Sequence, residues 1–217
     1  MSPEKDKLLC AVLAHEYILC HKAYEEFFDM EFLLAHRGNN VKQIIVAHGI
    51  FQSFIHHLYE FCIGLIQRDL DSLKQISAND AEKHIMVVIE KVWRLERSNP
   101  ESYFYNMSET AFYGKFSCFP KHFRQARNNS AHAIIKRAQS GQPLAEFYRR
   151  YRMMLKVLFS HLTQWWSRLD IENTNWHDIG KFNIYDIAMQ EIHDHLVTLG
   201  KDGIPGYGTT VDQPPKA

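Results

Sequence analysis

Arg127, Asn128 and His132 form the string R-N-x-x-x-H, and their side chains are types that can act on phosphate esters. A neutral imidazole takes a proton from a hydroxyl or returns one to a leaving oxygen. Cations near His132 favour this neutral form near pH 7. A guanidinium binds a phosphate and stabilises the charge that develops on it during transfer. Metal-independent RNA cleavage requires this pairing, because it needs a base for the 2'-hydroxyl and a fixed cation for the phosphate.

The spacing of these residues suits a helix. A helix turns about 100° per residue, so residues four apart share one ridge. That ridge comprises Arg124, Asn128, His132 and Lys136. Arg127 lies one step round, and its long side chain can lean toward the same edge. We expect Arg124, Lys136 and Arg137 to attract RNA.

A structural interpretation of the same string stays open. Short strings recur by chance in any chain of this length. Arg127 would then be a solvated charge on a helix, and His132 a half-buried core residue.

An all-helical chain with R-N-x-x-x-H near the start of a late helix resembles the HEPN superfamily. These small helical bundles occur in RNases of toxin–antitoxin, abortive-infection and CRISPR systems. The family pattern is R-x4-6-H, often with a polar residue after the Arg, and the resemblance spans residues 5–170. It implies a cytoplasmic homodimer in which two motifs face each other and form one RNA-cleaving site, without a metal or cofactor.

The resemblance also implies a role for each residue of the string. His132 would be the general base or acid, and Arg127 would position the phosphate. Asn128 would hold the phosphate or orient the neighbouring His. An antitoxin or regulatory protein is a further expected partner. HEPN proteins paired with a nucleotidyltransferase antitoxin carry a Tyr two residues after the His, and Ile134 occupies that position here, which argues against that particular partner.

The scaffold that positions the string is predicted to be an all-α bundle of five to six helices. Apolar residues make up 46% of the 217 residues, which is ample for a core, and the body is poor in Gly and Pro. Breaks at 37–40, 77–80, 99–100 and 140–143 separate the helices. The first expected helix begins after Ser2-Pro3. The later ones cover 41–69, 81–97, 121–139 (the motif helix), 144–169 and 184–199. The domain would span 1–199, followed by a flexible tail over 200–217.

Apolar spacing predicts which helix faces are buried. Ile44, Ile45 and His48 should lie on the buried stripe of the second helix, and Trp165 and Trp166 on that of the helix over 144–169. Residues 101–120 hold seven aromatic side chains. They either stack on bases of single-stranded RNA or fill a gap between helices or at a dimer contact, and we favour the second interpretation.

The net charge of zero conceals an asymmetry. Residues 121–168 hold ten Lys or Arg and one acid, Glu146, so this segment carries +9 and the remainder carries −9. Such a segment is typical of polyanion binding. Alternatively, it docks on the acidic part of the same chain or of a second copy. The position of the string inside this segment favours nucleic acid.

Several classes of protein are not expected. Cysteines 10, 20, 62 and 118 lack CxxC spacing, which predicts buried thiols of a reducing compartment and no zinc site. His56 and His57 are adjacent and face different directions, so they do not form a metal site on one helix face. Neither a signal peptide nor an apolar run of 18 residues is present, so we expect no membrane span.

A non-catalytic RNA- or nucleotide-binding module and a helical protein-interaction module remain alternatives to the ribonuclease.

Overall fold

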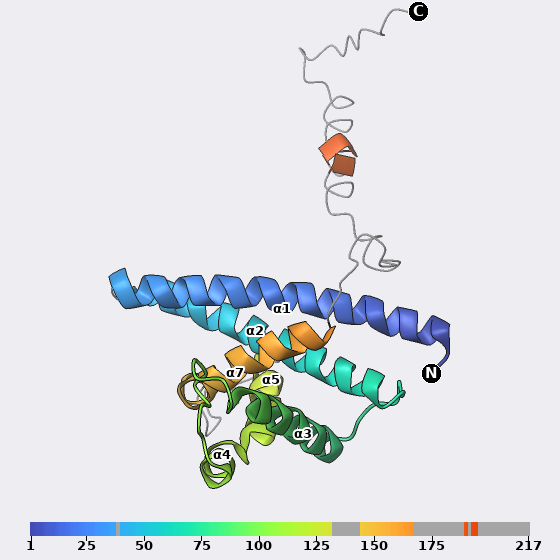
Figure 1. Cartoon of the computed structure of the whole chain (residues 1–217). Coiled ribbons are helices and arrows are strands. Elements are labelled where there is room, and N and C mark those ends of the chain that lie inside the picture. Colours follow the sequence, from blue (N-terminus) through green and yellow to red (C-terminus); the bar gives the residue numbers. More distant parts are fainter. Residues whose placement is uncertain (38–39, 132–143, 167–188, 191, 195–217) are drawn as a thin grey trace, which may run out of the picture. The chain divides into compact units, whose positions relative to one another are not determined.

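A computed structural model describes residues 1–37, 40–131, 144–166, 189–190 and 192–194. These residues form helices and no strand, which confirms the predicted all-α bundle (Figure 1). The named helices are α1 (Pro3–Arg37), α2 (Val41–Asp69), α3 (Ala78–Glu96), α4 (Glu109–Phe116), α5 (Phe119–Ala131) and α7 (Leu144–Trp166).

The chain divides into two compact units, Met1–Asn175 and Trp176–Ala217, and all the named helices belong to the first. In the second unit, residues 189–190 and 192–194 are described and are helical. The rest of the predicted 184–199 helix and the whole 200–217 tail lie outside the described residues. The domain boundary at residue 199 therefore stays a prediction.

Local capping signals explain where the helices begin. The side chain of Asn40 accepts a bond from the Lys42 N–H at 2.9 Å, and Ser77 Oγ accepts from the Asp80 N–H at 3.2 Å. Each bond satisfies a backbone donor that has no partner inside its helix. The predicted 41–69 helix has the observed bounds, whereas α3 begins three residues earlier than predicted because Ser77 itself is the cap.

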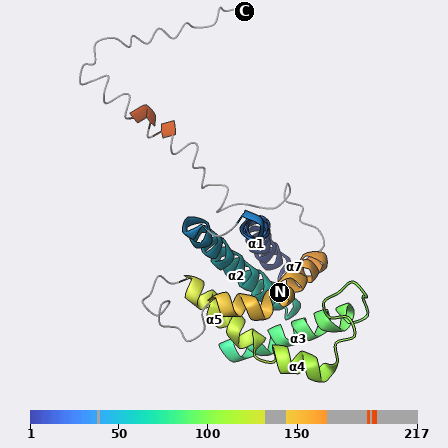
Figure 2. The ribbon, with the colours of Figure 1, turned by 90° about the vertical axis from the view of Figure 1, so that its left-hand side faces the viewer.

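The α1 and α2 helices form a long hairpin, and α2 also packs against α3, α5 and α7. Both views show α2 between α1 on one side and α3 and α5 on the other (Figures 1 and 2). Gly64 permits the close approach of α1 and α2, because a Cβ there would lie 2.5 Å from Leu13 Cδ2. A side chain at this position would force the buried Leu13 side chain to move.

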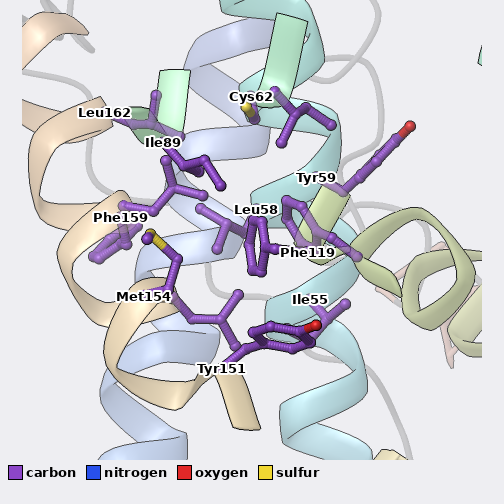
Figure 3. Packing of buried hydrophobic residues seen from close by; sticks show 14 of the residues in the cluster. Ile55, Leu58, Tyr59, Cys62, Ile89, Phe119, Tyr151, Met154, Phe159 and Leu162 are labelled. Carbon is purple, nitrogen blue, oxygen red and sulfur yellow. The ribbon is translucent and has the colours of Figure 1, made fainter. Parts of the chain in front are cut away.

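The core of the first unit is apolar and rich in rings (Figure 3). Leu58 of α2, Phe119 of α5 and Tyr151 of α7 are all buried within it. Phe119 packs on Tyr151 at 5.2 Å between ring centroids, and Phe123, one turn later, packs on Phe147 at 6.4 Å. The order along α5 is thus the reverse of the order along α7, as expected for antiparallel neighbours.

Two predicted buried stripes were wrong at their ends. Ile44 and Ile45 are 45% and 65% exposed, and His48 is also exposed. Figure 1 shows that α1 and α2 continue beyond α5 and α7 at this end of the hairpin, so α1 is the one described helix that lies against the first turns of α2. Trp165, predicted to be buried, is exposed in the last turn of α7. Periodicity identifies a face that can be buried, but a neighbouring element must be present to bury it.

The aromatic stretch over 101–120 contains α4, which the sequence did not predict. Ser108 caps this short helix by accepting a bond from the Ala111 N–H at 3.2 Å. Most of the phenylalanines are fully buried, which confirms the gap-filling interpretation for Phe104, Phe112, Phe116 and Phe119. Tyr103 and Tyr105 differ, because they are 42% and 46% exposed.

All four cysteines are free thiols. Cys20 and Cys62 are buried as predicted, and burial raises the pKa of the Cys62 thiol to about 12. The prediction is wrong for Cys118, which is exposed between α4 and α5, and Cys10 is only partly buried. Across the ranges that the structure describes, the helices are too short or too polar to span a membrane.

Candidate functional site

Helix α5 carries the described part of the string. Phe123 and Ala126 are buried on its inner face, which fixes the orientation of the helix and leaves Arg124, Arg127 and Asn128 half-buried at its edges. The remaining residues predicted for the site lie outside the described residues: His132, Lys136 and Arg137.

Arg127 is held by a carboxylate on α2. Its Nε donates to Glu60 Oε1 at 2.6 Å, and its Nη2 forms an ion pair with the same oxygen. The two side chains retain 29% and 30% of their accessible surface, so the pair is neither deeply buried nor fully solvated. The guanidinium is therefore fixed in place while one edge of it stays near solvent.

Asn128 provides a further contact to the same guanidinium. Its Oδ1 accepts a bond from Arg127 Nη1 at 3.1 Å. Described residues thus engage three of the five N–H groups of Arg127, which leaves one N–H group on each Nη nitrogen. Two N–H groups of this kind can donate to the oxygens of a phosphate.

Tyr59 supports Arg127 from the core side. The guanidinium carbon lies 5.8 Å from the Tyr59 ring centroid, within range of a cation–π contact. Tyr59 is itself 5.2 Å from Phe123, between ring centroids. Core packing thus helps to set the position of Arg127.

Arg124 binds a different helix. Its Nε donates to Glu82 Oε1 of α3 at 2.8 Å, and its Nη2 forms an ion pair with the same oxygen at 2.7 Å. Arg127 was expected to lean toward the edge that carries Arg124, but the two arginines reach carboxylates on different helices, because α5 lies between α2 and α3.

Two adjacent histidines of α2 lie near the site and differ in their surroundings. His57 Nδ1 is 2.8 Å from Glu16 Oε2 of α1. His56, one turn before Glu60, has a buried Nδ1 with no hydrogen-bond partner among the described residues. Burial lowers the pKa of His56, and the positive charges of His57 and Arg127 lower it further. These causes favour the neutral form of the His56 imidazole.

Much of the basic segment is compensated within the fold. Arg124 and Arg127 pair with acids of α3 and α2, while Arg152 and Lys156 of α7 lie 3.9 and 3.5 Å from Glu31 of α1. The alternative in which the segment docks on acidic parts of the same chain is therefore correct for these four cations. Three other cations of the segment have no carboxylate partner within the described ranges: Lys121, Arg149 and Arg150.

The described part of the chain contains no group of three or more His, Cys, Asp or Glu side chains that could hold a metal ion. What the site offers instead is an oriented guanidinium, an amide and an imidazole whose neutral form is favoured. Such a set can bind a phosphate and exchange protons near it.

Sequence reasoning missed the two carboxylates that hold the arginines. Glu60 lies 67 residues before Arg127, and Glu82 lies 42 residues before Arg124. Glu82 is an ordinary acid on a charged helix and nothing local marks it. Glu60 is the only acid of α2 before its last residue, Asp69, so its isolation in an apolar helix was the one signal available. Of the predicted site residues, the structure brings Arg127 and Asn128 together.

Comparisons of the chain with family models, with curated proteins and with solved structures gave no match.

Proposed function

We propose that this chain is a metal-independent endoribonuclease of the HEPN type, acting in defence or as a toxin. The proposal rests on one observation above all. The R-N-x-x-x-H string begins in the last turns of α5, where Glu60 and Asn128 fix the guanidinium of Arg127 at a half-buried position.

Arg127 would bind the phosphate that is cut. Its two remaining N–H groups can donate to the non-bridging oxygens, whose charge grows in the transition state. Glu60 is a positioning residue in this account, because it touches Arg127 and not the RNA. A guanidinium fixed before the RNA binds loses little freedom when the phosphate arrives.

His132 would move the protons. As a base it takes the proton of the 2'-hydroxyl, and the 2'-oxygen then attacks the adjacent phosphorus. The bond to the 5'-oxygen breaks, and that oxygen takes a proton from a protonated imidazole as it leaves. The products are a 2',3'-cyclic phosphate and a 5'-hydroxyl, and no metal ion is required.

A second copy of the chain would complete the site, with the two strings facing each other across a twofold axis. Arg124, Lys136 and Arg137 would add positive charge that attracts RNA. An antitoxin or regulatory protein acting in the cytoplasm would keep the activity silent.

The test is cleavage of a 5'-labelled, mixed-sequence RNA in EDTA, comparing the natural protein with His132→Ala. The natural protein should cut and leave 2',3'-cyclic phosphate ends, and the variant should not cut. Arg152→Ala is a matched control, because it removes an exposed cation of the basic segment that lies outside the string. Cutting by His132→Ala at the natural rate would overturn the proposal, and so would cutting that needs a divalent ion.

The exposed tip of the α1–α2 hairpin favours a second candidate, a helical protein-interaction module. Phe32, Val41, Ile45 and Val46 are 62%, 73%, 65% and 50% exposed, an apolar group of the kind found at protein contacts. This candidate predicts a chain that neither cuts nor binds RNA at moderate salt, and that loses self-association or partner binding when Ile45 is changed to Ser. Sedimentation of the natural protein and of Ile45→Ser measures the self-association.

A further inference from the structure

Three cations from three helices gather at the end of the bundle where α4, α5 and α7 meet. We define the α4–α5–α7 cation cluster as Lys115, Lys121 and Arg150. Arg150 Nη2 of α7 donates to the carbonyl oxygen of Lys115, in the last turn of α4, at 3.4 Å. This contact joins two of the three helices directly.

His122 of α5 links the third helix to this cluster. Its Nδ1 is joined to the hydroxyl of Tyr151 by a hydrogen bond of 2.8 Å, and the Arg150 guanidinium carbon lies 5.3 Å from the ring centroid of Tyr151. Burial lowers the pKa of His122, and the charges of Arg150 and Lys121 lower it further. The positive charges of Arg150 and Lys121 therefore both act on the His122 imidazole.

The cluster lacks the acids that compensate the other cations of α5 and α7. Within the described ranges, none of its three cations forms an ion pair, and Glu146 is the acid that acts on His122. Arg152 and Lys156 lie on the same α7 helix and both approach Glu31. An uncompensated group of this kind attracts polyanions.

An exposed aromatic ring lies beside the cluster. Lys115 Nζ lies 4.9 Å from the ring centroid of Tyr103 and donates to its hydroxyl. The next residue, Phe104, is fully buried against Phe116 at 5.7 Å between ring centroids, so the backbone that carries Tyr103 is anchored in the core. A bond of 3.2 Å from the Asn106 N–H to the Arg97 carbonyl oxygen also fixes this loop. Tyr103 thus presents a ring to solvent from a fixed loop.

Proteins bind single-stranded nucleic acid through cations that contact the phosphates and aromatic rings that stack on the bases. The cluster is also close to the candidate site along α5. Lys121 and Arg127 are six positions apart on α5, which is about 9 Å along the helix axis and about 120° around it. A single strand that passes Arg127 can therefore reach the cluster by following the surface round α5.

We propose that the α4–α5–α7 cation cluster and Tyr103 bind the single-stranded RNA next to the Arg127 site. Lys115, Lys121 and Arg150 contact phosphates, and Tyr103 stacks on a base. The identity of the polyanion as RNA rests on the proposed function. The surface itself rests on the uncompensated charge and the exposed ring.

Binding is tested without cleavage by using the full chain with His132→Ala. The probe is a fluorescein-labelled, mixed-sequence single-stranded RNA, and its anisotropy is followed between 50 and 200 mM salt, roughly the range over which phosphate contacts weaken. In this background Lys115→Gln/Arg150→Gln is compared with Arg152→Gln/Lys156→Gln. Both pairs remove one Lys and one Arg, but only the second pair is compensated by Glu31.

The cluster pair should weaken binding by at least about tenfold and reduce the salt slope by about 1.4, the value for two lost phosphate contacts on a single strand. The control pair should change affinity less than about twofold, because its charges are already compensated. Equal losses in the two pairs would mean that only net charge matters, and would overturn the proposal.

Tyr103 provides an independent test. Tyr103→Ala should weaken binding by about fivefold or more, and Tyr103→Phe should restore it, because stacking needs the ring and not the hydroxyl. With an RNA duplex of the same sequence Tyr103→Ala should have no effect, since duplex bases are not free to stack. Unchanged single-strand affinity in Tyr103→Ala would overturn the stacking role.

The outcomes separate this proposal from the proposed function. If the natural protein does not cut RNA but the cluster pair still loses binding, the ribonuclease proposal fails and the binding surface stands. If the natural protein cuts RNA and the cluster pair binds as well as its parent, the surface fails and the ribonuclease proposal stands.

Discussion

Two groups of cations on neighbouring helices differ in what their charges meet. Arg124 and Arg127 each donate from Nε to a carboxylate on another helix and form an ion pair with the same oxygen through Nη2. In the α4–α5–α7 cation cluster, Arg150 instead donates to a backbone carbonyl, and no described carboxylate pairs with it. A paired arginine has a fixed direction and little net charge, while an unpaired one has charge but little orientation. The first suits a group that must be placed beside a reacting bond, and the second suits capture of a polyanion.

The same apolar core positions both groups of cations. A substitution in this core should therefore have the largest effect, and the quantity it changes is the free energy of unfolding. Phe123 is fully buried and packs on Tyr59 of α2 and Phe147 of α7. Phe123→Ala should lower the free energy of unfolding by about 3–5 kcal/mol, because it leaves a cavity among these rings. Urea unfolding measures this loss. Phe32→Ala, at the exposed hairpin tip, should change it by less than about 0.5 kcal/mol. Equal effects would show that Phe123 does not lie at the centre of the packing.

The next largest effect should come from removing the carboxylate charge that pairs with Arg127, and it should appear in the rate of RNA cleavage. Glu60→Gln removes the charge that fixes Arg127, and we expect RNA cleavage to slow by about tenfold or more because the guanidinium is no longer held in place. RNA affinity should not fall, since a negative charge is removed.

The matched control is Glu82→Gln, which makes the same change beside Arg124. It should alter the cleavage rate less than about threefold, because Arg124 is assigned to attraction and not to the reacting phosphate. Single-turnover rates of the two variants decide between them. If both fall alike, orientation is not what distinguishes Arg127.

A smaller effect should appear in the pH dependence of stability. The folded-state pKa of His122 lies below the unfolded value of 6.5. As pH falls through 6.5 the unfolded chain takes up a proton first, so this residue stabilises the fold above that pH and the contribution is lost as the pH falls toward the folded pKa.

His122→Gln should therefore lose less stability than the natural protein when the pH is lowered from 7 toward 5, as followed by urea unfolding. Arg150→Gln should raise the pKa of His122 in an NMR titration, because it removes one of the charges that lower it. Arg152→Gln, on the same helix, is the control. An identical titration in both variants would show that the cluster does not act on His122.

Local signals sufficed to predict most of the helices. Asn40 and Ser77 cap helices through bonds to residues two and three positions away, which lie in plain view in the sequence. The burial of Phe104 and Phe112 could also be anticipated from the density of aromatic residues between 101 and 120. The α4 helix itself was missed because it is only eight residues long and lies inside that aromatic run.

Long-range contacts could not be predicted. The arginines of the basic segment were visible in the sequence, but Glu60 and Glu82 were not recognisable as their partners. Only the packing of α5 between α2 and α3 brings these side chains together. For the same reason the net charge of +9 over residues 121–168 did not reveal which cations would be compensated. The exposure of Ile45 likewise depended on where the neighbouring helices end.

The most direct test of the account measures single-turnover cleavage of one labelled RNA in EDTA over a range of protein concentrations. Arg127→Ala should lower the rate constant at saturation by at least about a hundredfold and leave the half-saturating concentration nearly unchanged, as expected for a group that acts in the transition state. Arg150→Ala should raise the half-saturating concentration and leave the saturated rate constant intact. If both variants change the same parameter, the division between an oriented and a capturing group of cations is wrong.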